Sequence, residues 1–401
     1  AAGHELRLLQ CGAEFFPSLL HAIAASNSEV RLETYIFHFD SVGEQVAHAL
    51  VRAAQRGVRV FLVMDGIGTP QVPVIWQQRF EEAGVQWHRF SPLGRWGLLI
   101  PTRWRRLHRK LCVVDAQVAY CGGINIVDDW VDPTVGTLES PRFDFSVRVT
   151  GPLVGDVLRK MEQFWRRLQL TRQIGKMEFQ GARQLWEAES ESLLQVVSDV
   201  WRSKASAKKT GAHAALLLRD NVRNRTGIER AYRKAIATAR QEVVIANAYF
   251  LPGGKLRRAL VHAARRGVRV RLLIQGRYEY FMQYHGAKPV LLALLNAGVE
   301  IHEYRAGFLH AKVAVVDGRW ATVGSSNLDP LSLLLAREAN VVVDDAHFAK
   351  DLHARLEIAM RQDSQPLDVE RYSARPWTQH VLDWLAYGMM RAILFLTGRR
   401  Y

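Results

Sequence analysis

The chain has 401 residues, 48% of them hydrophobic and 23% charged, so it is long enough for two globular domains of about 200 residues each, and extended disorder is excluded. Its 54 basic and 39 acidic side chains give a net charge of +15, which predicts a polyanionic partner: nucleic acid, an anionic membrane surface or a phosphorylated substrate. A membrane-spanning helix and a signal peptide are not expected, and three cysteines form no disulfide or metal-binding pattern.

The first part of the chain predicts helices alternating with strands. An amphipathic helix precedes an apolar strand within residues 22–37, and an Ala- and Arg-rich helix ends at Gly57, a residue suited to the left-handed conformation that stops helices. A buried strand over residues 58–66, another helix and a short strand over residues 83–90 follow. This alternation predicts an α/β fold in which helices cover both faces of a sheet.

A β-hairpin over residues 106–126 and a closing helix over residues 151–170 complete this unit. The hairpin adds antiparallel pairing, so the sheet is expected to be mixed. Residues 171–212 are polar and break the pattern, which predicts a linker containing one helix.

The same blocks then return in the same order, which indicates a duplicated domain. Residues 235–250, 259–276 and 297–304 resemble residues 22–37, 49–66 and 83–90, in that order. A second hairpin lies in residues 308–330, and a second closing helix in residues 344–363. We therefore predict two α-β-α sandwich domains related by a pseudo-twofold axis. The expected boundaries are 1–170 for the first domain, 171–212 for the linker, 213–365 for the second domain and 366–401 for an amphipathic, membrane-associating segment.

Both hairpins carry a histidine and a lysine where a strand would normally have Val or Ile. His108 and Lys110 are two residues apart, as are His310 and Lys312, so each pair projects from one face of its strand. A single strand histidine is more often a core residue than a catalyst, but two copies in matched blocks favour function.

The neighbouring strand of each hairpin returns with small residues and an asparagine, "GGIN" ending at Asn125 and "GSSN" ending at Asn327. Small residues there would let a ligand approach the backbone closely. If the two halves face one another, two imidazoles, two ammonium groups and two amides converge. Lys110, Lys312 and the amides would neutralise the oxygens of a phosphodiester, while one imidazole attacks phosphorus and the other protonates the leaving oxygen. Neither a metal nor another cofactor is expected.

These residues resemble the signature of the phospholipase D superfamily, HxKxxxxD followed by GxxN. The matching residues are His108, Lys110, Asp115, Gly122 and Asn125, and then His310, Lys312, Asp317, Gly324 and Asn327. The resemblance covers most of residues 5–362, and "VGSSNLDPLSL" and "QYHGAKPVLLALL" look most like the bacterial cardiolipin synthases of the B type. It implies a duplicated α-β-α sandwich with the active site between the halves.

The resemblance also implies a carboxylate after each motif that orients a histidine. Glu338 and Asp144 occupy the matching places, and crossed pairing is expected, Glu338 with His108 and Asp144 with His310. The superfamily usually assigns the N-terminal histidine as nucleophile, which here would be His108. The alternative is that both carboxylates are solvated charges at strand edges.

Asp115 and Asp317 count among the catalytic residues of the motif. Each lies an odd number of residues after its lysine and should point away from it, and Asp317 begins an ordinary Asp-Gly turn. We interpret both as structural supports of the site, with direct chemistry as the alternative.

One basic segment and one apolar segment contain tryptophans that suit a membrane interface. The candidate lipid-docking residues are Trp96, Arg103, Trp104 and Arg105 before the first motif, and Trp377 and Trp384 near the C-terminus. The first segment could equally be an ordinary surface loop or contact DNA, and the second could be a core-packing helix.

The hypothesis is a phosphatidyltransferase that makes cardiolipin from two phosphatidylglycerol molecules through a phosphatidyl-histidine. The lipids are implied by the resemblance alone. We expect an anionic phospholipid substrate, a membrane surface as partner and no nucleic acid, with peripheral or monotopic placement at the cytoplasmic face of the bacterial inner membrane. The alternatives are a hydrolase or nuclease of the same superfamily, or a non-catalytic protein that binds anionic membranes.

Overall fold

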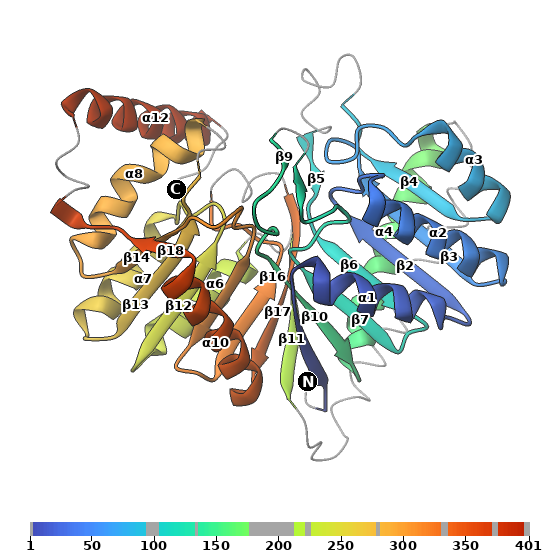
Figure 1. Ribbon diagram of the computed structural model, residues 1–401, viewed down its shortest axis with the longest axis horizontal. Helices are drawn as coiled ribbons and strands as arrows, with labels where there is room; N and C mark the ends of the chain where they lie inside the picture. Colours follow the sequence, from blue (N-terminus) through green and yellow to red (C-terminus); the bar gives the residue numbers. More distant parts are fainter. Residues whose placement is uncertain are drawn as a thin grey trace.

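The computed structural model describes residues 3–93, 104–132, 135–175, 212–220, 226–277, 281–329, 336–370 and 376–396. Two α/β domains lie side by side along the long axis of the molecule (Figure 1). Each domain has a mixed sheet between helices, as the repeated blocks predict.

The first domain is built on a seven-stranded sheet of order β1-β10-β7-β6-β2-β3-β4. Its strands are β1 (Glu5–Gln10), β2 (Glu29–Thr34), β3 (Arg59–Asp65), β4 (Gln86–Phe90), β6 (Lys110–Val114), β7 (Val118–Gly122) and β10 (Phe145–Thr150), with short β5 (Arg106–Leu107), β8 (Val131–Asp132) and β9 (Gly136–Thr137) outside it. Strands β2, β3 and β4 are parallel, and the hairpin β6–β7 adds antiparallel pairing. Its helices are α1 (Cys11–Ala24), α2 (Ser41–Gln55), α3 (Val74–Ala83) and α4 (Leu153–Gly175).

The second domain repeats this order strand for strand: β11-β17-β16-β15-β12-β13-β14, with β18 added at the far edge. Its strands are β11 (His213–Arg219), β12 (Glu242–Asn247), β13 (Arg269–Gln275), β14 (Glu300–Tyr304), β15 (Lys312–Val316), β16 (Trp320–Gly324), β17 (Ala336–Asp344) and β18 (Ser364–Pro366). Its helices are α6 (Gly227–Thr238), α7 (Gly254–Arg265), α8 (Phe281–Leu295), α10 (Ala346–Gln362) and α12 (Trp377–Leu396). The matching strand order supports the duplication.

Local sequence explains where these elements begin and end. Gly57 and Gly267 follow α2 and α7 with φ of 90° and 85°, a left-handed conformation that favours glycine and stops each helix as predicted. The apolar runs of β2 and β12 are buried at the centre of their sheets because helices cover both faces.

The interface between the domains is part of a shared hydrophobic core. One cluster combines Val113 of β6 and Val157 of α4 with Val313 of β15 and Leu352 of α10. Helix α4 also contacts β11, and α10 contacts β1, so each closing helix packs partly on the other domain. This mutual packing fixes how the two motif hairpins face each other.

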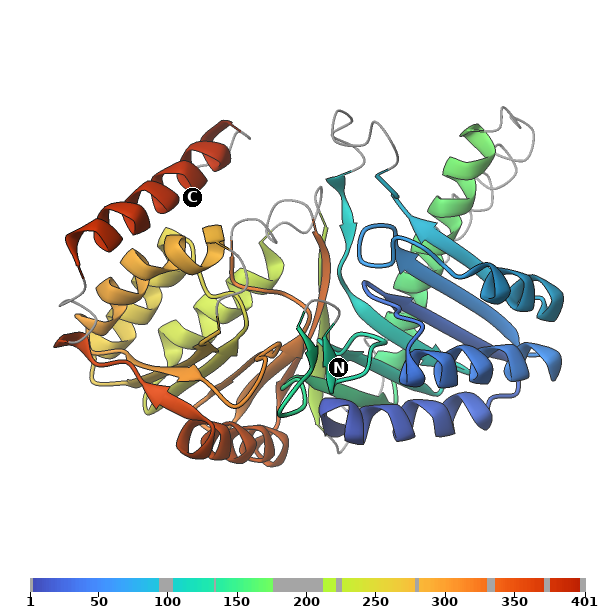
Figure 2. The ribbon, with the colours of Figure 1, turned by 45° about the horizontal axis from the view of Figure 1, so that its top comes forward.

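Near the C-terminus, α12 packs against α8 and lies apart from both sheets (Figure 2). Asp383 interrupts the apolar sequence of α12, yet it is only 2% exposed. Its carboxylate can be buried because Oδ1 pairs with His285 Nδ1 at 2.7 Å. No helix within the described ranges combines the length and apolarity that a membrane crossing requires. Helix α4 extends five residues past the expected boundary at residue 170, and the helix expected in the linker lies outside the described residues.

Candidate active site

The backbone of the opposite domain holds each histidine. Strand β5 pairs in parallel with β17, and the His108 N–H donates to the carbonyl oxygen of Arg337 at 3.0 Å. The second copy repeats the arrangement, because Leu309 bridges in parallel to Phe143 and the His310 N–H donates to the Phe143 carbonyl at 2.8 Å. Both motif strands are therefore fixed to the interface, next to the chain segment that carries the other domain's carboxylate.

The two histidines pair with carboxylates across the interface. His108 Nδ1 lies 3.0 Å from Glu338 Oε2, and His310 Nδ1 lies 2.6 Å from Asp144 Oδ2. These are the crossed contacts that the resemblance implies. A carboxylate that accepts the Nδ1–H fixes the imidazole tautomer and leaves Nε2 as the reactive nitrogen.

The two lysines are buried beside the histidines. Lys110 is 5% exposed and Lys312 is fully buried. Lys110 Nζ donates to the carbonyl oxygen of His108 at 2.7 Å, and Lys312 Nζ donates to that of His310. Lys312 Nζ also lies 4.0 Å from Asp144 Oδ2. Two buried ammonium groups at one site would attract an anionic substrate.

Burial and mutual repulsion disfavour the charged forms of these cationic groups. Burial lowers the pKa of His108 against the raising effect of Glu338, and it holds the pKa of His310 well below its ordinary value together with Lys312 and Lys110. Burial also lowers the pKa of Lys110 to about 7. A phosphodiester anion between these groups would favour their protonated forms, so their electrostatics match that class of substrate.

The two carboxylates differ in their surroundings. Ser325 Oγ donates to Glu338 Oε2 at 2.5 Å, and although burial alone would raise the pKa of Glu338, His108 brings it below the ordinary value. The matching position in the first domain is Gly123, where a Cβ would lie 2.3 Å from Asp144 Oδ1, so a serine there would displace this carboxylate. Burial raises the pKa of Asp144 to about 7. The Glu338 pair is thus the more ionic of the two.

The two motif asparagines follow β7 and β16 and are buried. Asn125 Oδ1 accepts from the N–H of Ile36 at 3.1 Å, whereas Asn327 Oδ1 is buried and has no hydrogen-bond partner among the residues that the structure describes. Asn125 thereby ties its loop to the chain after β2. In the second domain the tie runs the other way, because Asn247 Oδ1 at the end of β12 accepts from the N–H of Leu328 in the loop at 3.1 Å. Phosphate binding by these amides remains a prediction.

Asp115 and Asp317 lie at the far ends of β6 and β15, roughly 16 Å along the strand from each lysine. Asp115 Oδ atoms accept from the N–H groups of Asn27, Ser28 and Glu29 at 2.8–2.9 Å. Asp317 binds the N–H groups of residues 240–242 in the same way, at 2.8–2.9 Å. Both residues anchor the turn before the central strand. These bonds support the interpretation of both aspartates as structural supports of the site, and they do not support a direct catalytic role.

Several contacts around the histidines were not predicted from the sequence. The Tyr35 ring lies 4.9 Å from the His108 ring, and Lys110 Nζ lies 5.3 Å from that tyrosine. Arg109 and Glu33 form a buried ion pair directly behind the first motif. Comparing the aligned blocks could have pointed to these residues, because the second domain has alanine at the positions of Tyr35, Arg109 and Glu33.

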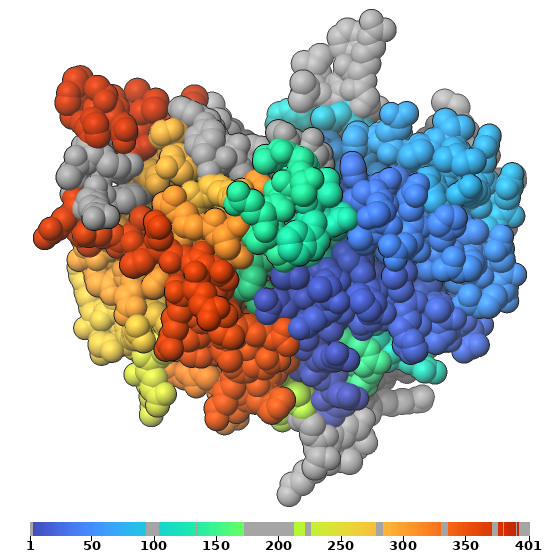
Figure 3. All heavy atoms as spheres, viewed as in Figure 1, coloured from blue at the N-terminus to red at the C-terminus, as the bar shows by residue number. Residues whose placement is uncertain are grey.

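The candidate docking residues are only partly described. Trp104 is 38% exposed and Arg105 is exposed, whereas Trp96 and Arg103 lie outside the described residues. On α12, Trp377 and Trp384 are 75% and 61% exposed. This helix forms one corner of the molecular surface (Figure 3). A role in lipid docking remains a prediction for all of these residues.

In the described part of the chain, no three His, Cys, Asp or Glu side chains gather in a group that could hold a metal ion. The reactive groups that the site itself supplies are two imidazoles and two ammonium groups, backed by two carboxylates. This set can carry a phosphoryl group on one nitrogen while the other imidazole moves a proton.

Comparison with known proteins gives matches over the whole chain. The family model described as "Cardiolipin synthase, PLD-like domain" matches residues 19–132 and 232–359. Cardiolipin synthase B of Escherichia coli (strain K12) is 37% identical over 400 residues, covering 99% of this chain and 90% of that protein. A minor cardiolipin synthase of Bacillus subtilis (strain 168) is 27% identical over 383 residues, covering 95% of this chain and 87% of that protein.

Among solved structures, phosphatidylserine synthase of Haemophilus influenzae Rd KW20 shares the fold with a TM-score of 0.66 at 12% identity. The match covers 98% of this chain and 93% of that one, so both domains and their arrangement correspond. With both motifs in the matched regions and close relatives over nearly its full length, the chain belongs to the cardiolipin synthase family of phospholipase D-like proteins.

Proposed function

We propose that this protein is a phosphatidyltransferase that joins two phosphatidylglycerol molecules into cardiolipin and releases glycerol. The observation that carries the proposal is the pair of crossed histidine–carboxylate contacts, in which each domain supplies the carboxylate that orients the other domain's imidazole. The family membership supports the choice of lipid substrates.

In the first step, His108 Nε2 attacks the phosphorus of one phosphatidylglycerol. The bond from phosphorus to the glycerol oxygen breaks, and that oxygen takes a proton from His310 Nε2. Lys110 and Lys312 neutralise the non-bridging oxygens as charge builds up on them. Glu338 accepts the Nδ1–H of His108 and stabilises the positive charge that develops on the ring.

In the second step, a hydroxyl of another phosphatidylglycerol attacks the phosphatidyl group on His108. His310 Nε2 takes the hydroxyl proton, the new P–O bond forms and the P–N bond to His108 breaks. Burial raises the pKa of Asp144 to about 7, so its carboxyl group is near half-protonation at neutral pH. A partner of this kind suits an imidazole that donates a proton in one step and accepts one in the next.

The site of action is proposed to be an anionic membrane surface, at the cytoplasmic face of the bacterial inner membrane. A net charge of +15 and the exposed apolar side chains of α12 support peripheral attachment. Replacing Trp377 and Trp384 together by serine should weaken sedimentation with phosphatidylglycerol vesicles; unchanged sedimentation would show that α12 is not the attachment site.

The activity is tested with purified protein and vesicles of labelled phosphatidylglycerol, and separately with DNA. Formation of cardiolipin and glycerol in equal amounts supports the proposal. Phosphatidate as the main product would indicate a hydrolase, and DNA cleavage without lipid turnover would indicate a nuclease. His108→Ala protein with unchanged lipid turnover would contradict catalysis by this site.

A further inference from the structure

The second domain has a cavity next to its motif, at a place where the first domain has a tyrosine. The cavity has a volume of about 60 Å³, and Ala248 forms part of its lining. Ala248 occupies the position that Tyr35 occupies in the first domain, where the tyrosine ring packs on His108. The pseudo-symmetric site is therefore unequal, with additional space on the side of His310.

The cavity adjoins the reactive groups through the backbone. The Ala248 N–H donates to the carbonyl of Ala311, which lies between His310 and Lys312, at 3.0 Å. Arg277, another lining residue, places its guanidinium 5.5 Å from the ring centre of Phe308, two residues before His310. The cavity therefore lies on the side of the second motif, next to the strand that carries His310.

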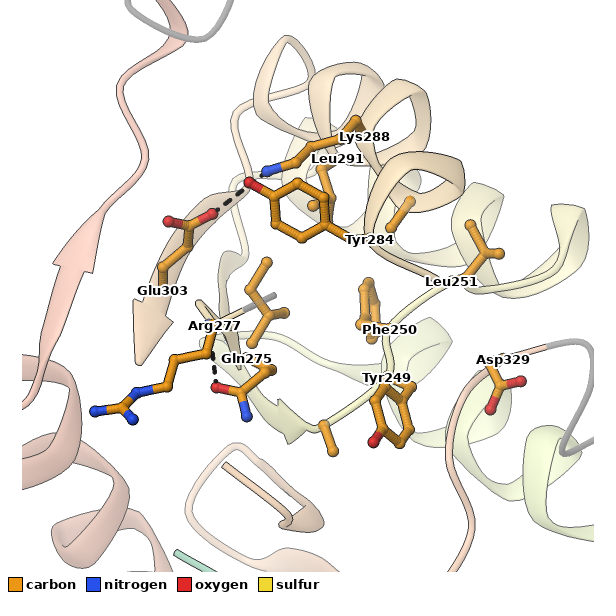
Figure 4. A pocket seen from close by; sticks show the side chains of 13 residues that line it. Tyr249, Phe250, Leu251, Gln275, Arg277, Tyr284, Lys288, Leu291, Glu303 and Asp329 are labelled. Carbon is orange, nitrogen blue, oxygen red and sulfur yellow. Dashed lines mark hydrogen bonds and ion pairs between the residues drawn. The ribbon is translucent and has the colours of Figure 1, made fainter. Parts of the chain in front are cut away.

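The lining combines an apolar wall with groups that suit a glycerophosphate headgroup. Figure 4 shows Tyr284 and Lys288 entering from α8, Glu303 from β14, and Tyr249 and Phe250 from the segment after β12. Lys288 Nζ lies 3.7 Å from Glu303 Oε1, and Arg277 lies 3.8 Å from Oε2 of the exposed Glu139. A phosphate could share these two cations, and a carboxylate oxygen could accept hydrogen bonds from glycerol hydroxyls. Leu251, Ile274 and Leu291 supply the apolar surface.

A wider hollow lies between this cavity and α12. It has a volume of about 530 Å³ and shares Tyr284, Lys288 and Glu303 with the first. Its other walls include Leu382 and Asp383 of α12, the helix whose outer face carries exposed tryptophans. The wider hollow has the volume that a lipid headgroup requires, and the smaller cavity beyond the shared residues lies on the side of the second motif.

We infer that this cavity and the adjoining hollow bind the acceptor phospholipid, whose headgroup hydroxyl resolves the phosphatidyl-enzyme. The inference rests on the proposed function. In a displacement at phosphorus the attacking oxygen lies opposite the bond that breaks, so an acceptor must approach from the side away from His108. There His310 takes the hydroxyl proton, the P–O bond forms and the P–N bond to His108 breaks. Arg277 binds the acceptor's own phosphate.

The test measures how often the phosphatidyl-enzyme reacts with a large acceptor and how often with a small one. Wild-type protein is given phosphatidylglycerol vesicles and added methanol, and the ratio of cardiolipin to phosphatidylmethanol is measured. Ala248→Tyr, which places the first domain's residue in the cavity, should lower this ratio about tenfold or more, because methanol does not need the space. Ala293→Tyr, the same change at an exposed position of α8, should leave the ratio unchanged.

Arg277→Gln provides a second variant that adds no bulk, and it should also lower the ratio. If Ala248→Tyr fails to fold, as judged by circular dichroism, Arg277→Gln decides the question. A wild-type ratio in both variants, or an equal loss of both products in folded protein, would overturn the inference. Wild-type protein that forms neither product would instead contradict the proposed function.

Discussion

The two domains share strand order and motif but differ in what surrounds each histidine. In the first domain, Tyr35 packs on His108 and a buried Arg109–Glu33 pair lies behind the motif. In the second, alanines replace these residues and a cavity opens beside His310. The packed side suits a nucleophile held in one orientation, and the open side suits a proton carrier that must admit two different alcohols.

The carboxylates differ in the same sense. Glu338, held by Ser325, has a lowered pKa and keeps its charge beside His108, whereas the pKa of Asp144 is raised to about 7 beside His310. A charged partner strengthens a nucleophilic imidazole, and a partner near half-protonation suits reversible proton transfer. Duplication supplied two equal sets of groups, and the neighbours of each set give them separate roles.

The largest expected difference comes from the carboxylates. Glu338→Gln should lower kcat by about 10²-fold or more, because a neutral amide no longer stabilises the charged His108 ring and permits the wrong tautomer. Asp144→Asn should cost less, since Asp144 is already partly neutral at pH 7. Steady-state cardiolipin formation by both variants measures the difference, and a greater loss in Asp144→Asn would reverse the assignment of roles.

Lys110→Met should lower activity by about 10²-fold while raising stability. The folded-state pKa of Lys110 is about 7 against an ordinary value of 10.5, so the unfolded chain binds more protons between these pH values and wild-type stability rises with pH there. A buried lysine charge lowers the free energy of unfolding, and this cost is largest below pH 7. Methionine carries no charge and removes it. Thermal melts should show a Tm gain of roughly 5 °C at pH 7 that shrinks toward pH 10. A lower Tm at pH 7 would contradict this account.

Ser325→Ala should lower activity about tenfold, the usual cost of losing a group that orients a catalytic partner. The loss should fall on kcat and shift the acidic limb of the pH profile upward, because Glu338 loses a hydrogen bond that favours its charged form. Ser326→Ala, at the neighbouring buried serine, is the matched control and should change kcat less than twofold. Equal effects of the two changes would indicate packing alone.

The smallest effect on catalysis is expected at the motif aspartates. Asp115→Ala and Asp317→Ala should each lower the free energy of unfolding by about 1–3 kcal/mol, since several backbone N–H groups lose their acceptor. The kcat of the folded fraction should stay within twofold of wild type. Urea titration followed by rate measurement separates the two quantities, and a 10²-fold loss of kcat at full stability would return these residues to the catalytic set.

The repeated blocks predicted the duplicated fold, and the HxK spacing predicted which side chains share a strand face, because both follow from periodicities along the chain. Crossed contacts of Glu338 and Asp144 came from the resemblance. The cavity at Ala248 and the Ser325 contact could not be predicted, since each depends on side chains that are distant in sequence. Asp383 shows the same limit: it marked α12 as unfit to span a membrane, but its buried pairing with His285 required the packing of α8.

The most direct test of the central claim is to trap the covalent intermediate. Protein mixed with labelled phosphatidylglycerol is quenched in neutral denaturant, which spares both the acid-labile P–N bond and the alkali-labile acyl esters, then digested and mapped by mass spectrometry. The account predicts one phosphatidyl group on His108 in the wild-type protein and none in His108→Ala. A label on His310 in the wild-type protein, or cardiolipin formed at full rate with no adduct on either histidine, would contradict it.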